Sequence, residues 1–234
     1  MITQVVAHTF AGIFWTTTYV LIVLKSRADR TYGMPLAALG AKPRLGVLLH
    51  GGLPAHLRQH LRLPRPAHID SVWLLTDLAV LWYVFRYGPR EFPGLSRPLC
   101  YAMFTGVIAV TAVTDVLVSR EFGDRYGLRA SYLQSLMMSL LFLGMLQARK
   151  SLRGQSPGIA TAKMLGTAAA SLGVYARPPL AEYGHSALLK FLYLVCLVAD
   201  AVYVVAVYRM RQGGSGPARP PGKVGAKAGV GGER

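Results

Sequence analysis

Three aspartates lie inside apolar stretches of this 234-residue chain, where an ionisable side chain is energetically expensive. Asp200 is near the middle of LYLVCLVADAVYVVAVY, Asp77 is midway through VWLLTDLAVLWY, and Asp115 is toward the end of VTAVTDVLVS. A carboxyl group kept from water favours its protonated form, which can act as a Brønsted acid toward an apolar substrate. The alternative is a hydrogen bond that only packs helices together, which suits one aspartate better than three. We therefore predict that all three are catalytic.

Aromatic side chains accompany these acids along the same stretches. A carbocation on a polyene chain would need an apolar cavity that is walled by π faces and free of nucleophilic water. Trp and Tyr also gather at membrane interfaces, which explains part of their number, so only rings in the middle of a span support such a cavity. We predict the following substrate-binding residues: Trp73, Tyr83, Tyr132, Gln134, Tyr193 and Tyr203.

The composition indicates which elements position these residues. Hydrophobic residues make up 53% and charged residues only 15%, with a mean hydropathy of +0.36; soluble chains carry about 25% charge. A bilayer core about 30 Å thick needs about 20 apolar residues per helix. Runs of about that length lie at 1–24, 68–85, 98–118, 130–147, 157–176 and 187–210. The sequence predicts an all-α polytopic membrane protein with one helical bundle over 1–211, followed by a disordered basic tail over 212–234.

A seventh span begins at Tyr32 and stops after ten residues, at Ala41. The stretch 42–66 then carries five of the 26 Lys and Arg and three of the six His, with no acidic and no aromatic residue. A basic amphipathic loop on the membrane surface is one interpretation. If a helix is restored at about 32–53, Lys and Arg are concentrated in alternate loops and in the tail. That alternation predicts seven helices, with the N-terminus outside and the C-terminus in the cytoplasm.

Four strings in order resemble the small seven-helix integral membrane terpene cyclases: DRTYGMPL, VWLLTDLAVLWYVFRYG, ASYLQSLMMSLLFL and FLYLVCLVADAVYVV. Members of that family make fungal meroterpenoids and indole diterpenes, and bacterial members act on prenylated indole alkaloids or cyclic dipeptides of the drimentine type. The resemblance covers most of residues 1–210. It implies a cyclase that protonates an alkene or epoxide of a prenyl chain, without a metal or other cofactor. It also implies two essential acids, of which the one in helix 7 matches Asp200.

The second family acid belongs to an Asn-x-x-Trp-Glu motif in helix 2, where this chain reads KPRLGVLLHGG. If the Lys42 codon is AAA and reading begins at its second base, permitted codons give Asn-Leu-Gly-Trp-Glu and then an apolar run. We therefore predict one base gained near codon 42 and one lost near codon 66. As printed, Gly46 occupies the position of the family glutamate, so we expect this exact chain to be impaired.

The predicted partners are a prenylated small molecule, with a farnesyl-like chain, and membrane lipid. Nucleic acid is excluded because the basic residues lie mainly between apolar runs rather than on one face of a soluble fold. The GC-rich codon usage implied by the excess of Arg over Lys favours a bacterial cytoplasmic membrane. A small proton-coupled or cation-coupled transporter is the alternative function, because intramembrane acids also relay protons. The sequence does not indicate an oligomeric state.

Overall fold

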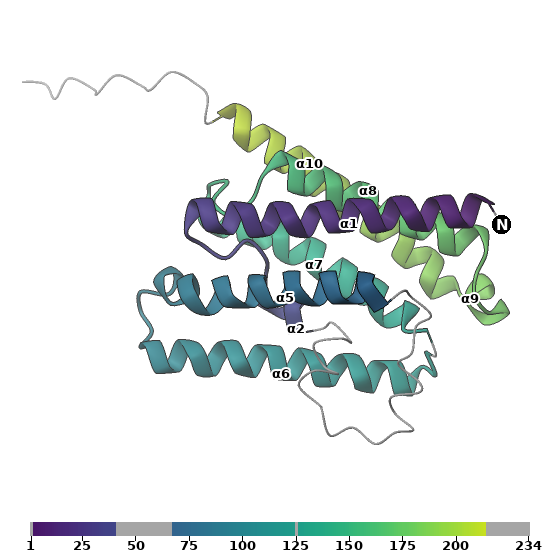
Figure 1. The fold of residues 1–234 in the computed structure, drawn as a ribbon, viewed down its shortest axis with the longest axis horizontal. Helices are drawn as coiled ribbons and strands as arrows, with labels where there is room; N and C mark the ends of the chain where they lie inside the picture. The colour runs from purple at the N-terminus through teal and green to yellow at the C-terminus, as the bar shows by residue number, and fades with distance from the viewer. Residues whose placement is uncertain (1, 41–66, 125, 214–234) are drawn as a thin grey trace, which may run out of the picture.

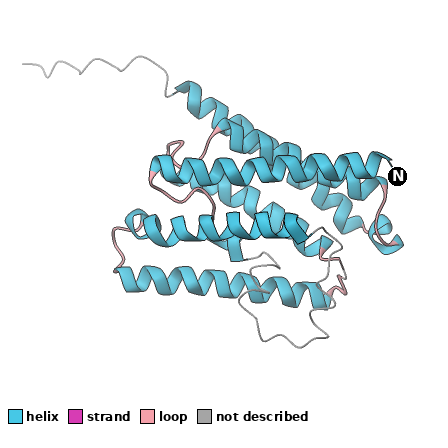
Figure 2. Cartoon of the chain, viewed as in Figure 1, coloured by secondary structure: helices cyan, strands magenta, loops and turns pink. Residues whose placement is uncertain are grey.

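The computed structural model describes residues 2–40, 67–124 and 126–213, and those residues form helices and turns without strands (Figure 2). The predicted all-α class is confirmed. The helices are α1 (Ile2–Asp29), α2 (Leu36–Gly40), α5 (Ala67–Tyr87), the 3-10 helix η1 (Gly88–Glu91), α6 (Arg97–Glu121), α7 (Leu128–Arg149), α8 (Pro157–Ala176), α9 (Ala181–His185) and α10 (Ala187–Gly213).

Five of the six apolar runs each fall within one long helix, and the described part of the first run, from Ile2 onward, lies within α1. Among the described residues, α1, α6, α7 and α10 are long and apolar enough to cross a membrane. The helices extend beyond the apolar runs where local contacts support another turn. For example, α1 continues to Asp29 because Lys25 forms an ion pair of 3.0 Å with Asp29 one turn later. At the start of α8, the Ser156 side chain accepts a 3.2 Å hydrogen bond from the Ile159 N–H group, and Pro157 occupies the first turn.

Contacts between loops show that α1 and α5 end at the same end of the bundle. The Thr31 hydroxyl donates a 2.7 Å hydrogen bond to Glu91, which follows α5, and Arg153 lies 3.4 Å from the same carboxylate. The Gly154 N–H group donates a 2.7 Å hydrogen bond to Asp29. We call this end, which also holds the end of α7 and the start of α8, the basic end (Figure 1).

The shared direction of α1 and α5 bears on topology. α1 ends at the basic end and α5 begins at the opposite end, so the chain returns from one end of the bundle to the other between Asp29 and Ala67, and α2 lies in that part of the chain. Only Leu36–Gly40 of the predicted helix over 32–53 is described as helical. The predicted frame-shifted segment 42–66, with Gly46, lies outside the described residues, and so does the predicted tail from 214 onward.

At the opposite end of the bundle, hydrogen bonds to Asp124 hold the start of α7 and the short helix α9 together. The Asp124 carboxylate accepts 3.0 Å hydrogen bonds from the Leu128 and Ala130 N–H groups, which are the free donors at the start of α7. The Tyr183 hydroxyl of α9 donates a 2.8 Å hydrogen bond to the same carboxylate. Burial raises the pKa of Tyr183 to about 12, so the phenol keeps the proton that it donates.

Small residues allow α8 to pack closely against α1. A Cβ atom added at Gly166 would lie 2.9 Å from the Trp15 ring, and one added at Gly173 would lie 2.7 Å from the His8 ring. Close approach of this kind is how helices pack within lipid, where burial of apolar surface gives little drive for association. The packing brings the α8 face that carries Lys163 against Trp15.

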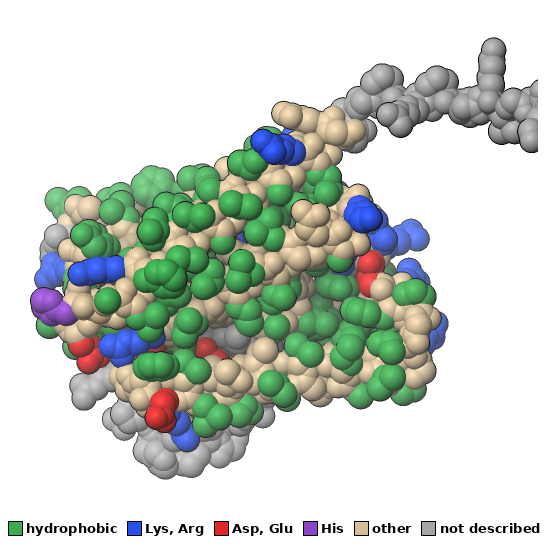
Figure 3. All heavy atoms as spheres, turned by 180° about the vertical axis from the view of Figure 1, so that it is seen from behind, with side chains coloured by type: hydrophobic (Ala, Val, Ile, Leu, Met, Phe, Trp, Pro, Cys, Tyr) green, Lys and Arg blue, Asp and Glu red, His purple; other side chains and the backbone are tan. Residues whose placement is uncertain are grey.

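The outside of the bundle is apolar along its length. Large side chains such as Phe10, Val110, Leu117, Phe191 and Val202 are each at least half exposed. Figure 3 shows hydrophobic side chains over the middle of one face, with Lys and Arg mainly toward the ends. Such a surface is suited to lipid and not to water, because water-soluble monomers rarely expose so large an apolar area. The chain is an integral membrane protein.

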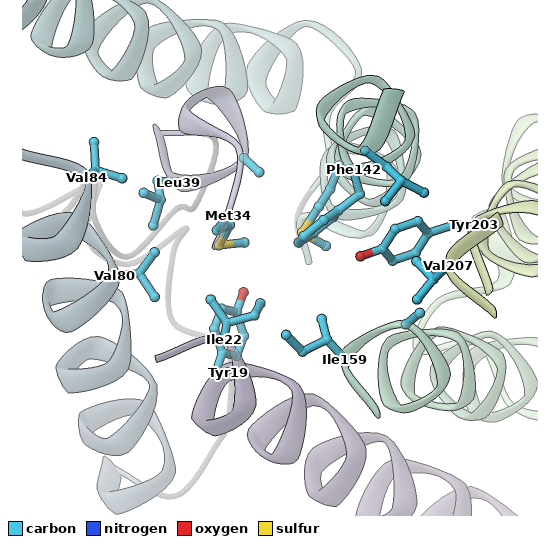
Figure 4. Packing of buried hydrophobic residues seen from close by; sticks show 14 of the residues in the cluster. Tyr19, Ile22, Met34, Leu39, Val80, Val84, Phe142, Ile159, Tyr203 and Val207 are labelled. Atoms are coloured by element: carbon cyan, nitrogen blue, oxygen red, sulfur yellow. The ribbon is translucent and has the colours of Figure 1, made fainter. Parts of the chain in front are cut away.

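Inside the bundle, one apolar core contains side chains from every long helix, and α10 contributes to it only from its C-terminal half. It includes Met34, just before α2, and Leu39 within α2, and side chains of α1, α5, α7, α8 and α10 converge on them (Figure 4). A second cluster around Tyr132, Tyr183 and Cys196 fills the opposite end. The catalytic candidate Asp200 lies on α10 between Cys196 and Tyr203, where the two clusters adjoin.

Candidate active site

Asp200 is fully buried at the middle of α10 and takes its contacts from two neighbouring helices. Its Oδ1 atom lies 2.6 Å from the hydroxyl of Ser139 on α7 and forms an ion pair with the ammonium group of Lys163 on α8. Its Oδ2 atom is buried and has no hydrogen-bond partner among the described residues. A buried carboxylate oxygen without a partner is costly and calls for an explanation.

Lys163 is also fully buried, and the ion pair is the centre of a small polar cluster. Its ammonium group lies 2.6 Å from the Ser139 hydroxyl oxygen and 5.9 Å from the centre of the Trp15 ring on α1. The Ser139 hydroxyl can donate to Asp200 or to the Ser135 carbonyl, which is 2.9 Å away. Because the ion pair carries no net charge, it can be held in the apolar interior at a lower cost than either group alone.

The helical period explains why these side chains meet. Buried positions on α10 recur every three or four residues at Leu192, Cys196, Asp200, Tyr203 and Val207. The buried face of α7 has the same spacing and includes Ser139, and that of α8 includes Lys163. Each polar residue thus occupies a core position of an apolar helix face, and packing of α10 against α7 and α8 brings the three together.

Two of the predicted aromatic residues flank the ion pair along α10. One turn toward the basic end, the Tyr203 hydroxyl donates a 3.1 Å hydrogen bond to the Gln155 side chain, and its ring lies 5.3 Å from that of Phe142. Toward the opposite end, the rings of Tyr193 and Tyr132 meet edge to face at 4.6 Å. Tyr193 also lines a hollow of about 270 Å³ that opens between α8, α9 and α10.

The other predicted residues lie on α5 and α6, except Gln134, which lies on α7 with Ser139. Asp77 is buried on α5 and Asp115 is buried on α6. The half-buried Tyr83 stacks on Tyr87 within α5, with ring centres 5.8 Å apart. The Gln134 amide donates a 3.1 Å hydrogen bond to the Ala38 carbonyl of α2, so it fastens that short helix to α7. The Trp73 side chain lies outside the described residues.

Sequence reasoning did not identify Lys163 and Ser139 as partners of Asp200. A signal was present, because an ammonium group in the apolar run PGIATAKMLGTAAASLGVYA requires a buried counter-charge. Only a few intramembrane acids can supply that charge, and Asp200 is one of them. Ser139 gave no such signal.

The fold and the site together define a polytopic α-helical membrane protein with a buried ion pair in its interior. The sequence model of the Pyr4-like transmembrane terpene cyclases matches residues 63–213, which is more than half of the chain. The chain belongs to that family.

Several fungal proteins are similar to the chain over most of their length. The Pyr4-family terpene cyclase mfmH of Annulohypoxylon moriforme is 22% identical over 202 residues, covering 82% of this chain and 80% of the relative. The terpene cyclase ascF of Acremonium egyptiacum is 24% identical over 225 residues, with 86% and 80% covered. The terpene cyclase macJ of Penicillium terrestre is 26% identical over 213 residues, with 85% and 78% covered. No solved structure matches the chain.

These comparisons confirm the predicted family and enzyme class: the chain is a membrane terpene cyclase. They give no support to a transporter. The relatives named above are fungal, so they do not support the predicted bacterial membrane either.

Proposed function

We propose that this cyclase closes rings in the prenyl chain of a prenylated small molecule, in a reaction that begins with protonation of a terminal alkene or epoxide. The observation that carries the proposal is Asp200, a fully buried carboxylate whose Oδ2 atom has no partner among the described residues. An interior without bulk water suits a carbocation, which water would otherwise capture.

The proposed reaction leaves the elemental composition of the substrate unchanged. A proton adds to the terminal alkene carbon, or to the epoxide oxygen with opening of its C–O bond, and a carbocation forms. The π electrons of the next double bond then form a new carbon–carbon bond, and the cation moves along the chain. Loss of a proton from carbon ends the reaction, so substrate and product are isomers. Asp200 acts either by giving the first proton or by stabilising the cation and taking the last proton.

The remaining predicted residues have supporting roles in this proposal. Asp77 and Asp115 are buried acids on α5 and α6, and we expect Asn at either position to lower the rate less than Asn at Asp200 does. Tyr203, Tyr193 and Tyr132 lie on both sides of Asp200 along the bundle. Their π faces can stabilise the cation as it moves along the prenyl chain.

Conversion by membranes tests the function. Membranes containing the chain are incubated for a long period with farnesylated aromatic acceptors, each as the alkene and as the terminal epoxide. We expect a product of unchanged mass that has fewer carbon–carbon double bonds, and none from membranes lacking the chain. Long incubation is used because we expect the printed chain to be slow. If neither the printed chain nor the frame-restored form described in the Discussion gives an isomeric product, the proposal is wrong.

We also propose that the basic end faces the cytoplasm. The supporting observation is that Lys25, Arg149 and Arg153 lie together there, as expected for the side of a membrane that retains Lys and Arg. A reporter fused after Met210 should be cytoplasmic, and one fused before Met1 should be external. If both reporters are on the same side, the chain makes an even number of crossings and segment 42–66 does not cross.

We propose that the frame shift is real, on the observation that the family model matches only from residue 63, whereas the matches to the relatives cover 82–86% of the chain. The family match begins at residue 63, close to the point near codon 66 where we predict that the normal frame resumes. A segment read in the wrong frame would lose its likeness to the family over that length.

A further inference from the structure

The contacts of Asp200 bear on which of its two possible roles it has in the proposed reaction. The Lys163 ammonium group and the Ser139 hydroxyl both meet Oδ1. Hydrogen bonds and positive charge at a carboxyl oxygen stabilise the ionised form of the group. A carboxylate held in this way is a poor donor of a first proton, but it is well suited to stabilise a nearby cation.

The orientation of the Asp200 carboxylate also favours a role in stabilising the cation. Because Oδ1 is engaged by both neighbours, the plane of the carboxylate is fixed, and Oδ2 is the oxygen left without a hydrogen bond among the described residues. A cationic carbon chain in van der Waals contact with Oδ2 would satisfy the buried oxygen without a hydrogen-bond donor. The lack of a hydrogen bond from a protein side chain to Oδ2 is then a feature of the site and not a packing defect.

We propose that Lys163 is a positioning residue that keeps Asp200 ionised and directs Oδ2 toward the reacting chain, so that Asp200 stabilises the cation and takes the terminating proton. This inference rests on the proposed function, and it assigns the first proton to a group other than Asp200. In the last step the carbon–hydrogen bond electrons form the product double bond, and the proton moves to Oδ2. The proton then leaves to solvent or to the initiating acid, which restores the ion pair.

The surroundings of Asp200 make Lys163 the residue to test. On α8 the charged group that faces Asp200 is Lys163, and on α7 the polar group is the Ser139 hydroxyl. On α10 itself, the Cys196 thiol and the Tyr203 phenol interact electrostatically with Asp200 and carry no charge in their protonated forms. Among the described residues, substitution of Lys163 therefore removes the positive charge that acts directly on Asp200.

Infrared spectroscopy of the chain in membranes measures the ionisation directly and does not require turnover. A protonated carboxyl group gives a C=O stretching band that shifts in D₂O. At neutral pH we expect no such band from Asp200 in the parent chain. We expect the band in Lys163→Met, its loss in the double variant Lys163→Met/Asp200→Asn, and no band in Lys163→Arg. A parental band that Asp200→Asn removes, or no band in Lys163→Met, would overturn the proposal whether or not the chain is active.

The cyclisation rate gives a second test, because Lys163→Met changes that rate in opposite directions under the two possible roles of Asp200. If the carboxylate is the working form, Lys163→Met lowers the rate at pH 7 by about 100-fold, on the scale of a lost acid or base, and alkaline pH restores part of it. If Asp200 gives the first proton, Lys163→Met keeps or raises the rate at pH 7, and the proposal is wrong. Rates are compared in the printed chain and in the frame-restored form. Lys25→Met, at an ion pair on the basic end, is the matched control and should keep the parental rate.

Discussion

Asparagine at position 200 should abolish cyclisation almost completely. Asp200→Asn keeps the size of the side chain and an oxygen near Lys163 and Ser139, but it removes the negative charge and the exchangeable proton. Acid or base catalysis by one side chain contributes about 100-fold to 10,000-fold to a rate, and we expect a loss in that range. The measurement is the initial rate at which membranes containing the frame-restored form described below isomerise a prenylated acceptor, normalised to the amount of folded protein.

A loss of folding must be distinguished from a loss of chemistry. Asp200→Asn leaves the Lys163 ammonium group buried without its counter-charge, and breaking a buried ion pair in this way costs about 3–5 kcal/mol. The double variant Asp200→Asn/Lys163→Met removes both charges, so it should regain much of the thermal stability in detergent. It should regain no activity, because the carboxylate is still missing.

The control for this prediction is an acid outside the buried site. Glu121 is exposed at the end of α6, and Glu121→Gln makes the same change from acid to amide. It should keep the parental rate and stability. A parental rate in Asp200→Asn would remove Asp200 from the mechanism, and the proposal about Lys163 would no longer apply to the reaction.

Helix positions could be predicted from the sequence because the bilayer sets a length scale. The run predicted at 157–176 coincides with α8, and the described residues of the other five runs each lie within one helix. Burial of Asp200 could also be predicted, since an acid in the middle of an apolar run has few ways to avoid lipid except by facing the bundle interior.

Pairing between helices could not be predicted in the same way. Lys163 and Asp200 are 37 residues apart, and their contact depends on the rotation of α8 and α10 about their axes. Gln134 shows the same difficulty. Its type and position suggested a contact with substrate, but its amide nitrogen is bonded to the Ala38 carbonyl of the short helix α2. The same sequence pattern fits both outcomes, because a polar residue on a buried face can bond to a ligand or to another helix.

Restoring the reading frame should change the activity of the chain as much as the loss of Asp200 does. Because α1 and α5 run in the same direction, we expect the chain to cross the membrane once between Asp29 and Ala67. An apolar run that stops at Ala41 after ten residues reaches about 15 Å at 1.5 Å per residue, which is half of the hydrocarbon thickness. The printed sequence then places five cations and four prolines in 42–66. These residues complete a membrane span only at a large cost.

The expected damage is partial for the fold and severe for catalysis. The other long helices keep their apolar lengths, and many of their mutual contacts do not involve 42–66. The resemblance to the family implies two acids, however, and the printed chain has Asp200 without the helix 2 glutamate, whose position is taken by Gly46. If Lys163 keeps Asp200 ionised, the missing glutamate is also the natural source of the first proton. A chain without it retains the group that stabilises the cation but lacks the group that forms it.

The comparison uses the printed chain and a form in which one base is removed near codon 42 and one is added near codon 66. The restored form should isomerise a prenylated acceptor, and the printed chain should give little or no product. Two further forms separate the acid from the apolar helix. Gly46→Glu in the printed frame supplies a carboxyl group without the span and should not rescue activity. The restored frame with its glutamate codon changed to glutamine supplies the span without the acid, and it should fold but remain inactive. Equal activity of the printed and restored chains would show that the frame is intact, and that one buried acid on α10 is enough for this cyclase.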